Sequence, residues 1–294
     1  MIITFGSINV DLIFSMTAMP QAGQTLLAKS FRTEAGGKGA NQAVAAARDG
    51  AEVMMVGAVG EDSMAAVALQ NLQNVVDVSR VARVRVPTGC ASIFIDGDGH
   101  NMIAVASGAN LVASSDAVDD SLLQRASIVL LQMENEGSQI EKLIRRSKSA
   151  GVKAILNLAP AFPVEPKILS LCDLIVVNED EAEALAGWLG SGASAHQLST
   201  NLNTGVLRTL GAQGAEAVVQ GEEIKVSAMP VGVVDTTAAG DCFVGVLASA
   251  LDRGLSLEAA MRRASTAAAI ACSRPGSQAS IPVSAEIDQF NTSP

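Results

Sequence analysis

Aromatic and charged residues are both scarce in this chain of 294 residues. It has no Tyr and one Trp, and only 17% of its residues are charged. Hydrophobic residues make up 49% of it, which excludes an intrinsically disordered chain, and no run of about 18 apolar residues predicts a membrane span. The formal net charge of −10 does not suit non-specific binding to nucleic acid or to an anionic lipid surface.

Patterns that build zinc sites, disulfide frameworks or histidine triads are also missing. The four cysteines form no CxxC pair, so we expect free thiols in a reducing compartment. His100 and His196 lie among polar or small residues, with no second histidine or carboxylate at metal-binding spacing, and we expect both on the surface. The N-terminal stretch lacks the basic leader of a signal peptide, so we expect a cytoplasmic protein. The cysteines are Cys90, Cys172, Cys242 and Cys272.

Short apolar runs alternate with helical patterns along most of the chain. Strand followed by helix, repeated, predicts an α/β fold with a mostly parallel central sheet and helices on both of its faces. Arg208 is a charged residue within one expected strand, which places that strand near an edge or Arg208 near its end. The expected strands are residues 2–5, 53–59, 128–131, 154–158, 174–177, 206–210 and 217–219, and the expected helices are 41–48, 63–73, 138–150, 179–189, 241–253 and 256–271.

Two stretches, about residues 9–35 and 84–107, interrupt this alternation with extended segments. They predict a small antiparallel sheet that serves as a lid on a single domain spanning residues 1–294. Within it, residues 91–95 and 102–106 form a hairpin around Asp-Gly pairs, which lack the Gly and Glu that a calcium loop needs further on. The apolar positions of such a sheet would be exposed unless a second copy covers them, so we expect a homodimer through the lid.

The segment VVDTTAAGD carries the first candidate site, because a strand-like run there leads into a predicted helix. Free N–H groups at a helix start bind anions, and Gly240 lets a ligand approach the backbone. Asp241, in the first turn, suits a base that takes a proton from an incoming hydroxyl. From this segment alone, Asp241 is interpreted either as that base or as a residue that stabilises the helix dipole.

Two further segments combine glycine with polar side chains. AGGKGANQ is a helix entry where Asn41 can reach a small polar ligand, or an ordinary helix entry, and it is not a Walker A loop because Gly39 follows Lys38. GSINVD follows the first strand, and its Asn9 and Asp11 either bind adjacent hydroxyls from one side or form a turn.

Taken together, these segments resemble the ribokinase family of sugar and nucleoside kinases, and the resemblance covers nearly the whole chain. GGKGAN and DTTAAGD, as a pair and in this order, carry most of it. The resemblance implies a ribokinase-like fold, ATP as phosphoryl donor, Mg²⁺, and K⁺ as a monovalent activator. The matching motifs are GSINVD, GGKGANQAVAAAR, PTGCASIFIDGDG, SGAN, LQME, VNEDEAE, TLGAQG and DTTAAGD.

The resemblance also implies roles for individual residues. Asp241 matches the catalytic base, and the N–H groups of Ala238, Ala239 and Gly240 match an anion hole. Glu181 matches an indirect Mg²⁺ position, although a solvated helix face is the alternative. Ser265 departs from the His or Asn common beside the adenine, which puts base selectivity in doubt. The sugar positions are Asn9, Asp11, Gly37, Lys38, Asn41, Glu134 and Asp241; the nucleotide positions are Asn178, Thr209, Gly211, Gly214, Gly240 and Ser265; the K⁺ positions are Asp235, Thr237, Ala271, Arg274, Gly276 and Ser280.

The implied reaction is phosphoryl transfer from MgATP to the 5-hydroxyl of D-ribose. Deoxyribose, another pentose, a ketohexose or a nucleoside are alternative acceptors, and the scarcity of aromatic side chains favours a sugar over a nucleoside. A sugar sensor without catalysis is the remaining alternative, against which the intact DTTAAGD motif argues. The expected partners are therefore a small sugar and ATP, with no nucleic acid and no membrane.

Overall fold

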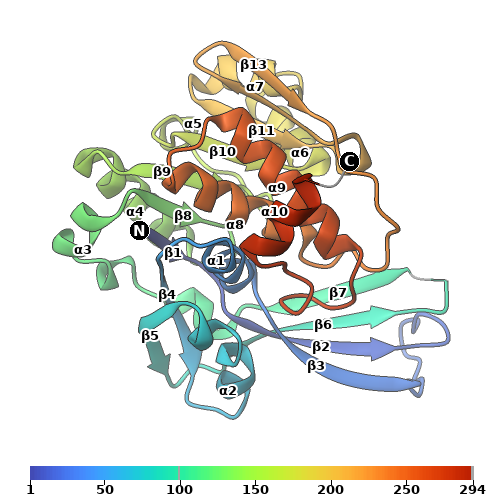
Figure 1. Ribbon diagram of the computed structural model, residues 1–294. Helices are drawn as coiled ribbons and strands as arrows, with labels where there is room; N and C mark the ends of the chain where they lie inside the picture. The colour runs from blue at the N-terminus through green and yellow to red at the C-terminus, as the bar shows by residue number, and fades with distance from the viewer. Residues whose placement is uncertain (99, 293–294) are drawn as a thin grey trace.

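The computed structural model describes residues 1–98 and 100–292, and its largest element is a nine-stranded sheet (Figure 1). Seven neighbouring strands run parallel, and two antiparallel strands extend one edge. Consecutive parallel strands need crossover helices, which explains the strand–helix alternation of the sequence. In sheet order the strands are β13 (Glu222–Val226), β12 (Ala215–Val219), β11 (Gly205–Thr209), β10 (Leu174–Val177), β9 (Lys153–Asn157), β8 (Ile128–Leu131), β1 (Ile2–Phe5), β4 (Val53–Gly60) and β5 (Asp77–Val84).

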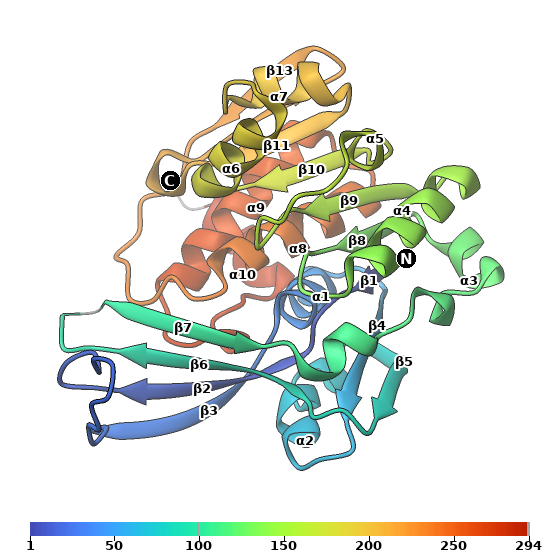
Figure 2. The same ribbon diagram turned by 180° about the vertical axis from the view of Figure 1, so that it is seen from behind.

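Helices cover both faces of this sheet and bury two separate apolar clusters against it. One face carries α1 (Lys38–Arg48), α2 (Met64–Leu69), α8 (Ala239–Asp252), α9 (Leu257–Cys272) and α10 (Ser284–Thr292). The other face, in front in Figure 2, carries α3 (Asp120–Arg125), α4 (Gly137–Ala150), α5 (Pro166–Leu169), α6 (Glu179–Leu189) and α7 (Ala195–Leu202). Short 3₁₀ turns are η1 (Leu72–Asn74), η2 (Gly108–Val112), η3 (Ser115–Ala117) and η4 (Gly211–Gln213).

A second sheet of four strands projects from one side of the body (Figures 1 and 2). Its order is β3 (Ser30–Gly36), β2 (Asn9–Ser15), β6 (Gly89–Ile95) and β7 (Asn101–Ala106). The predicted small sheet and its β6–β7 hairpin are confirmed, but the sheet is mixed, because β2 and β6 pair in parallel. Of the predicted Asp-Gly turn, Gly99 lies outside the described residues.

The seven strands expected from the sequence all form, but both outermost strands of the large sheet were missed. β5 carries Asp77, Arg80 and Arg83, and β13 carries two glutamates, because an edge strand exposes more of its side chains than a central one. Arg208 lies near the end of β11, as expected, and pairs with Glu216 of the neighbouring strand.

Among the helices, α3, α5, α7 and α10 were not predicted, since each is short or polar. The expected helix at 63–73 is also shorter than predicted, because α2 ends at Leu69 and a separate turn follows it.

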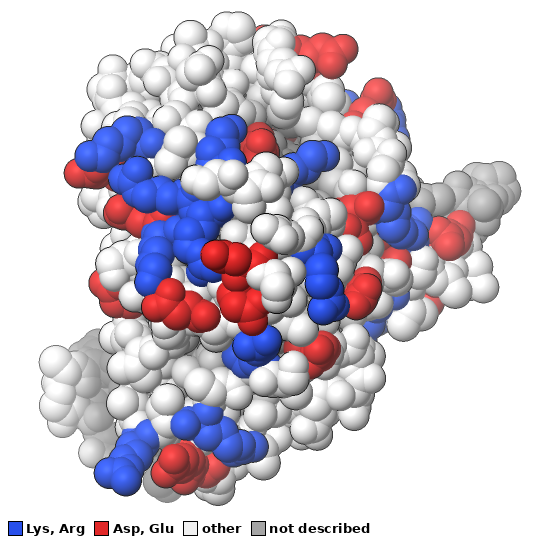
Figure 3. Space-filling view, turned by 90° about the vertical axis from the view of Figure 1, so that its left-hand side faces the viewer, with Lys and Arg blue, Asp and Glu red and all other residues white. Residues whose placement is uncertain are grey.

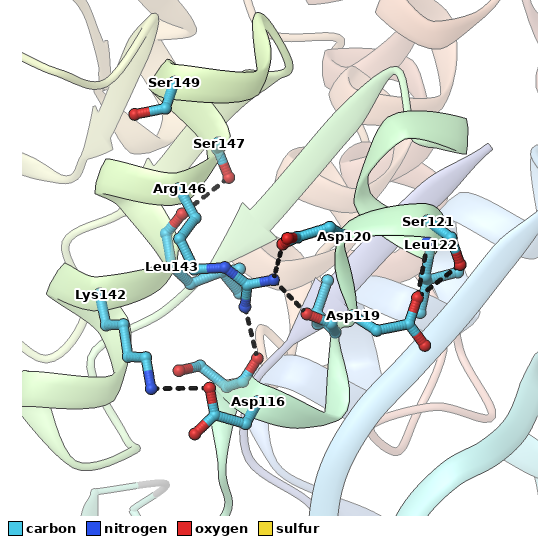
Figure 4. Close-up of polar contacts among 12 residues, drawn as sticks. Asp116, Asp119, Asp120, Ser121, Leu122, Lys142, Leu143, Arg146, Ser147 and Ser149 are labelled. Atoms are coloured by element: carbon cyan, nitrogen blue, oxygen red, sulfur yellow. Dashed lines mark hydrogen bonds and ion pairs between the residues drawn. The ribbon is translucent and has the colours of Figure 1, made fainter.

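Besides shared apolar packing, ion pairs and hydrogen bonds join α4 to the start of α3 and to the segment before it. Arg146 donates to the carbonyl oxygens of Ser115 and Val118 and pairs with Asp120 at 2.7 Å, while Lys142 pairs with Asp116 at 2.6 Å (Figure 4). On the face of the molecule seen in Figure 3, several basic side chains gather on one side, with acidic side chains beside and below them.

The four cysteines are free, as predicted, and both histidine side chains are exposed. The expectation that no carboxylate accompanies His100 is wrong, because the metal-ligating atoms of Asp96, Asp98 and His100 lie within 4.8 Å of one another at the β6–β7 turn. The turn itself brings these alternate residues together. Within the described residues, no helix is both long and apolar enough to cross a membrane.

Candidate active site

Helix α8 begins without a side-chain cap. Its N-cap is Ala238, whose φ of 57° is left-handed and whose methyl group accepts no hydrogen bond. A helix start of this kind leaves first-turn N–H groups available to an anion, and a Cβ at Gly240 would meet no atom within 4 Å. The N–H of Ala239 donates to the carbonyl oxygen of Thr236 at 3.2 Å, so that predicted donor has a partner within the turn.

The carboxylate of Asp241, in the first turn of α8, is held from α1. Its Oδ1 accepts a hydrogen bond from Gln42 Nε2 and its Oδ2 accepts one from Asn41 Nδ2, both at 2.9 Å. Burial raises the pKa of Asp241 above its usual value, against the opposing effects of Lys38 and the two amides, while Glu134 adds to the rise. The group is therefore a better proton acceptor than an exposed aspartate.

Glycines let the start of α1 lie directly against the segment that follows β1. Gly37 is the N-cap with φ of 91°, and a Cβ there would lie 2.8 Å from the backbone nitrogen of Asn9. A Cβ at Gly39 would lie 2.6 Å from the backbone nitrogen of Ser7. These two contacts explain the glycines of the GGKGAN motif and place Lys38 beside the carboxylates.

Lys38 and Glu134 form an ion pair, with Nζ and Oε1 3.7 Å apart. Burial alone would lower the pKa of Lys38, but Asp241, Glu134 and Glu181 together raise it. Glu134 also accepts a hydrogen bond from Ser7 Oγ. The lysine therefore stays charged among several acidic groups.

Asp11 of β2 is only 7% exposed and lies over Gly36, where an added Cβ would be 2.3 Å from its Oδ2. Burial, followed by the negative charges of Glu34, Asp241 and Glu134, raises the pKa of Asp11 from 3.8 to about 7. Four carboxylates thus converge with one lysine at this edge of the sheet.

The side chain of Asn9, also in β2, is fixed by an unpredicted partner. Its Oδ1 accepts from Asn110 Nδ2 at 2.7 Å, and Asn110 Oδ1 accepts the backbone N–H of Ile8 at 2.9 Å. Among the predicted sugar positions, Asn41 is hydrogen-bonded to Asp241, and Asp11, Lys38 and Glu134 interact with it electrostatically. Asn9 lies against Gly37 at the start of α1.

The predicted nucleotide positions follow the ends of β10 and β11. Asn178 and Glu181 form a capping box at the start of α6, in which each accepts the other's backbone N–H. Burial raises the pKa of Glu181, and both Lys38 and Asp241 act on it, so Glu181 is not a freely solvated side chain. Thr209 Oγ1 donates to the carbonyl oxygen of Val177 at 3.4 Å.

The turn after β11 contains two glycines with positive φ, Gly211 at 52° and Gly214 at 101°. A Cβ at Gly214 would lie 2.0 Å from the carbonyl oxygen of Val226, so the turn packs directly against β13. Ser265 of α9 donates to the carbonyl oxygen of Ser227, which follows β13. The nucleotide positions thus form a second group beside the first.

The predicted K⁺ positions meet around Asp235. Its Oδ2 accepts the N–H of Gly276 at 3.0 Å and its Oδ1 accepts the N–H of Thr237 at 2.9 Å. The hydroxyl of Ser277 is buried without a hydrogen-bond partner in the part of the chain that the structure describes.

The other three K⁺ positions lie in or after the end of α9. The carbonyl oxygen of Ala271 accepts the N–H of Arg274, whose side chain turns away to pair with Glu286 of α10. Ser280 is fully buried and donates to the carbonyl oxygen of Ser277.

A cavity of about 380 Å³ adjoins these groups at the carboxyl ends of β8 and β9. Its polar lining includes Glu134, Asn135, Ser107 and Glu141, and its apolar lining includes Met133, Phe162 and Val105. Because Val105 belongs to β7, the small sheet forms part of the enclosure.

Sequence reasoning missed a set of buried amides around Asp241 and Asn9. Gln42, Asn110 and Gln132 belong to motifs quoted above (GGKGANQAVAAAR, SGAN and LQME), and this was the only sequence signal for them. The others become visible only when the fold brings distant segments together. The missed residues are Gln42, Asn110, Gln132, Asn157 and Gln278.

Comparison with known proteins gives one consistent result. A family model described as pfkB family carbohydrate kinase matches residues 1–284. The ribokinase of Haemophilus influenzae is 37% identical (97% of this chain, 96% of that protein), and the deoxyribokinase of Salmonella typhi is 34% identical (99% and 97%). The structure of Arabidopsis thaliana ribokinase complexed with ribose and ATP has a TM-score of 0.90 at 31% identity, covering 100% of this chain and 99% of that one.

Proposed function

Because the chain belongs to the pfkB family of carbohydrate kinases, we propose that it transfers the γ-phosphoryl group of ATP to the 5-hydroxyl of D-ribose. The observation that carries this proposal is the Asp241 carboxylate, which lies in the first turn of an uncapped helix and is held by two amides of α1. A base beside an anion-binding helix start is what transfer of a phosphoryl group to an alcohol requires.

The sugar site combines hydroxyl acceptors and donors in a small space. Carboxylates such as Asp11 and Glu134 accept hydrogen bonds from sugar hydroxyls, while Lys38 and the amides of Asn9 and Asn41 donate them. Asn9 and Asp11 stand two residues apart on β2 and therefore face the same side. This arrangement suits adjacent hydroxyls of a small sugar.

In the proposed reaction Asp241 accepts the proton of the sugar hydroxyl while the oxygen of that hydroxyl forms a bond to the γ-phosphorus. The bond between that phosphorus and the bridging oxygen breaks, and ADP leaves with the electron pair. The N–H groups of Ala238 and Gly240 stabilise the charge on the phosphoryl oxygens, and loss of one such donor lowers kcat by about 10²–10³ in other enzymes. The base itself contributes roughly 10²–10⁴.

The metal positions fit the ions that the family implies. Glu181 lies within the electrostatic reach of Lys38 and Asp241, so a carboxylate is available near bound phosphates for Mg²⁺, which would neutralise phosphate charge. For K⁺, the hard oxygen donors that a monovalent cation prefers are offered by Asp235, by backbone carbonyls and by the Ser277 hydroxyl, which has no partner among the described residues.

Deoxyribose is the second candidate acceptor, because the deoxyribokinase of Salmonella typhi is 34% identical over 99% of this chain. The two sugars differ by the 2-hydroxyl. An ADP-release assay with ribose, deoxyribose, ketohexoses and nucleosides, with and without K⁺, ranks them directly, and a kcat/KM for deoxyribose above that for ribose would replace the first candidate.

The small sheet is proposed as a lid and as a dimer contact. Phe31, Met102, Ile103 and Val105 of this sheet are each 50–55% exposed, which leaves apolar surface for a second copy to cover. A monomeric mass by light scattering at micromolar concentration contradicts the dimer.

The proposed base is tested with Asp241→Asn. This variant should bind ribose in calorimetry but lose most of its turnover, because the amide cannot accept the proton. Wild-type binding without ADP release would instead indicate a sugar sensor, and a variant with near-full kcat would exclude Asp241 as the base.

A further inference from the structure

Two chains of amides converge on the Asp241 carboxylate, one on each oxygen. Gln42 donates to Oδ1, and the Oε1 of Gln42 accepts from Gln132 Nε2 at 2.7 Å. Asn41 donates to Oδ2, and the Oδ1 of Asn41 accepts from Gln278 Nε2 at 3.1 Å. We call the four side chains Asn41, Gln42, Gln132 and Gln278 the amide clamp.

The amide clamp is almost completely buried and is assembled from three parts of the fold. Its members are 0–5% exposed. Asn41 and Gln42 belong to α1, Gln132 directly follows β8, and Gln278 lies in the segment between α9 and α10. Gln42 Nε2 also lies 2.9 Å from Asn157 Oδ1 at the end of β9, which fixes that amide further. Amides this deeply buried normally have partners for both polar atoms, because a missing partner lowers stability.

The two far amides of the clamp break that rule in the same way. The Oε1 atoms of Gln132 and Gln278 are buried and have no hydrogen-bond partner within residues 1–98 and 100–292. Rotating the Gln132 amide alone would set its carbonyl oxygen against that of Gln42. Rotating both would aim the Gln42 carbonyl oxygen at the Asp241 carboxylate, and the same holds for Gln278 and Asn41. In both chains, each amide directs its N–H group along the chain toward Asp241. The carbonyl oxygens of the two far amides point the other way, and this is why they have no partner.

Resting on the proposed function, we propose that Gln132 and Gln278 are positioning residues for phosphoryl transfer, which hold the Gln42 and Asn41 amides with their N–H groups toward Asp241. A carboxylate has about four lone-pair positions, and the clamp fills two of them, which orients the remaining ones for the sugar hydroxyl. Without its far partner, a near amide can rotate and present an oxygen that repels the carboxylate.

Gln132→Met tests this proposal, because it removes the amide at similar volume without touching Asp241. We expect kcat to fall on the order of tenfold, the size of a lost hydrogen bond, with the KM for sugar unchanged. The matched control is Gln139→Met on α4, which removes hydrogen bonds to Ser115 at a site away from Asp241 and should leave kcat unchanged. Thermal unfolding of each variant checks that it is folded.

A double-mutant cycle separates positioning from a structural effect. If Gln132 acts through Asp241, then Gln132→Met has no further effect on the residual rate of Asp241→Ala. The proposal is overturned if the rate losses of Gln132→Met and Asp241→Ala multiply in the double variant. It is also overturned if Gln132→Met alone leaves kcat unchanged.

A second readout needs no turnover. The pKa of the Asp241 carboxyl, followed by ¹³C NMR as the difference from Asp241→Ala, should rise in Gln132→Met because donors to the charged form are lost, while Lys38 and Glu134 stay in place. An unchanged pKa contradicts the clamp. Absence of sugar phosphorylation by the wild type refutes the proposed function instead, and the two failures are thereby distinguished.

Discussion

Replacing Asp11 with Asn should stabilise the folded protein at high pH while weakening sugar binding. The pKa of Asp11 rises from 3.8 to about 7 on folding, mainly through burial and then through the charges of Glu34, Asp241 and Glu134. The folded state binds the proton of the Asp11 carboxyl more tightly than the unfolded state does. The stabilisation that this proton provides is therefore complete below about pH 4 and is lost as pH rises through 7. A pKa shift of this size changes the free energy of unfolding by about 4 kcal/mol in total, and about 2–3 kcal/mol of this is lost between pH 5 and pH 8.

The assay is chemical or thermal unfolding of wild type and Asp11→Asn at both pH values. The stability of the variant relative to wild type should increase by about 2–3 kcal/mol from pH 5 to pH 8, a shift in Tm on the order of 5 °C for a chain of this size. Asp98→Asn, the same substitution on the exposed β6–β7 turn, is the control for the chemical change itself. An equal difference at the two pH values would refute the reasoning, and an unchanged KM for ribose would remove Asp11 from the sugar site.

Three further predictions concern packing, charge and thiol reactivity. In Gly245→Ala, the new Cβ would lie 2.3 Å from the carbonyl oxygen of Gln42, so α8 and α1 must separate; we expect a loss of about 1–3 kcal/mol in urea unfolding and a lower kcat, and unchanged values would contradict it. In Lys38→Met, loss of the cation beside Glu134 should raise the KM for sugar on the order of tenfold in the ADP-release assay, whereas an unaltered KM would place Lys38 outside the site. Burial raises the pKa of Cys172 to about 12, so iodoacetamide at pH 8 should leave it unlabelled in the folded protein by mass spectrometry, and rapid labelling would disagree with the fold.

The central part of the fold was predictable because its strands are buried on both faces. Continuous apolar runs such as those of β1, β8 and β10 have no other simple interpretation between helical patterns. β5 and β13 escaped detection because they lie at the edges of the sheet, where charged residues replace the apolar pattern. The parallel pairing of β2 with β6 depends on a contact between distant segments, which no local pattern reveals.

The candidate site was predictable to the extent that its residues stand in local motifs. Asp241, Lys38 and Asn41 belong to segments whose glycines and polar residues already indicate a ligand. Gln132 and Gln278 could not be identified, because their role depends on hydrogen bonds to α1 from segments far away in sequence. One weak signal did exist, because Gln132 is an amide within the LQME motif, whereas Gln278 lies outside every quoted motif.

The four outer strands of the two sheets differ in how well they resist pairing with other chains. β5, β13 and β3 each carry charged side chains, which discourage the addition of another strand. β7, with the sequence NMIAVA, has none, and Met102, Ile103 and Val105 on it are 50–53% exposed. Unless another surface covers β7, intermolecular strand pairing will begin there, and a single lysine on this strand will do more for solubility than the same change on any other edge.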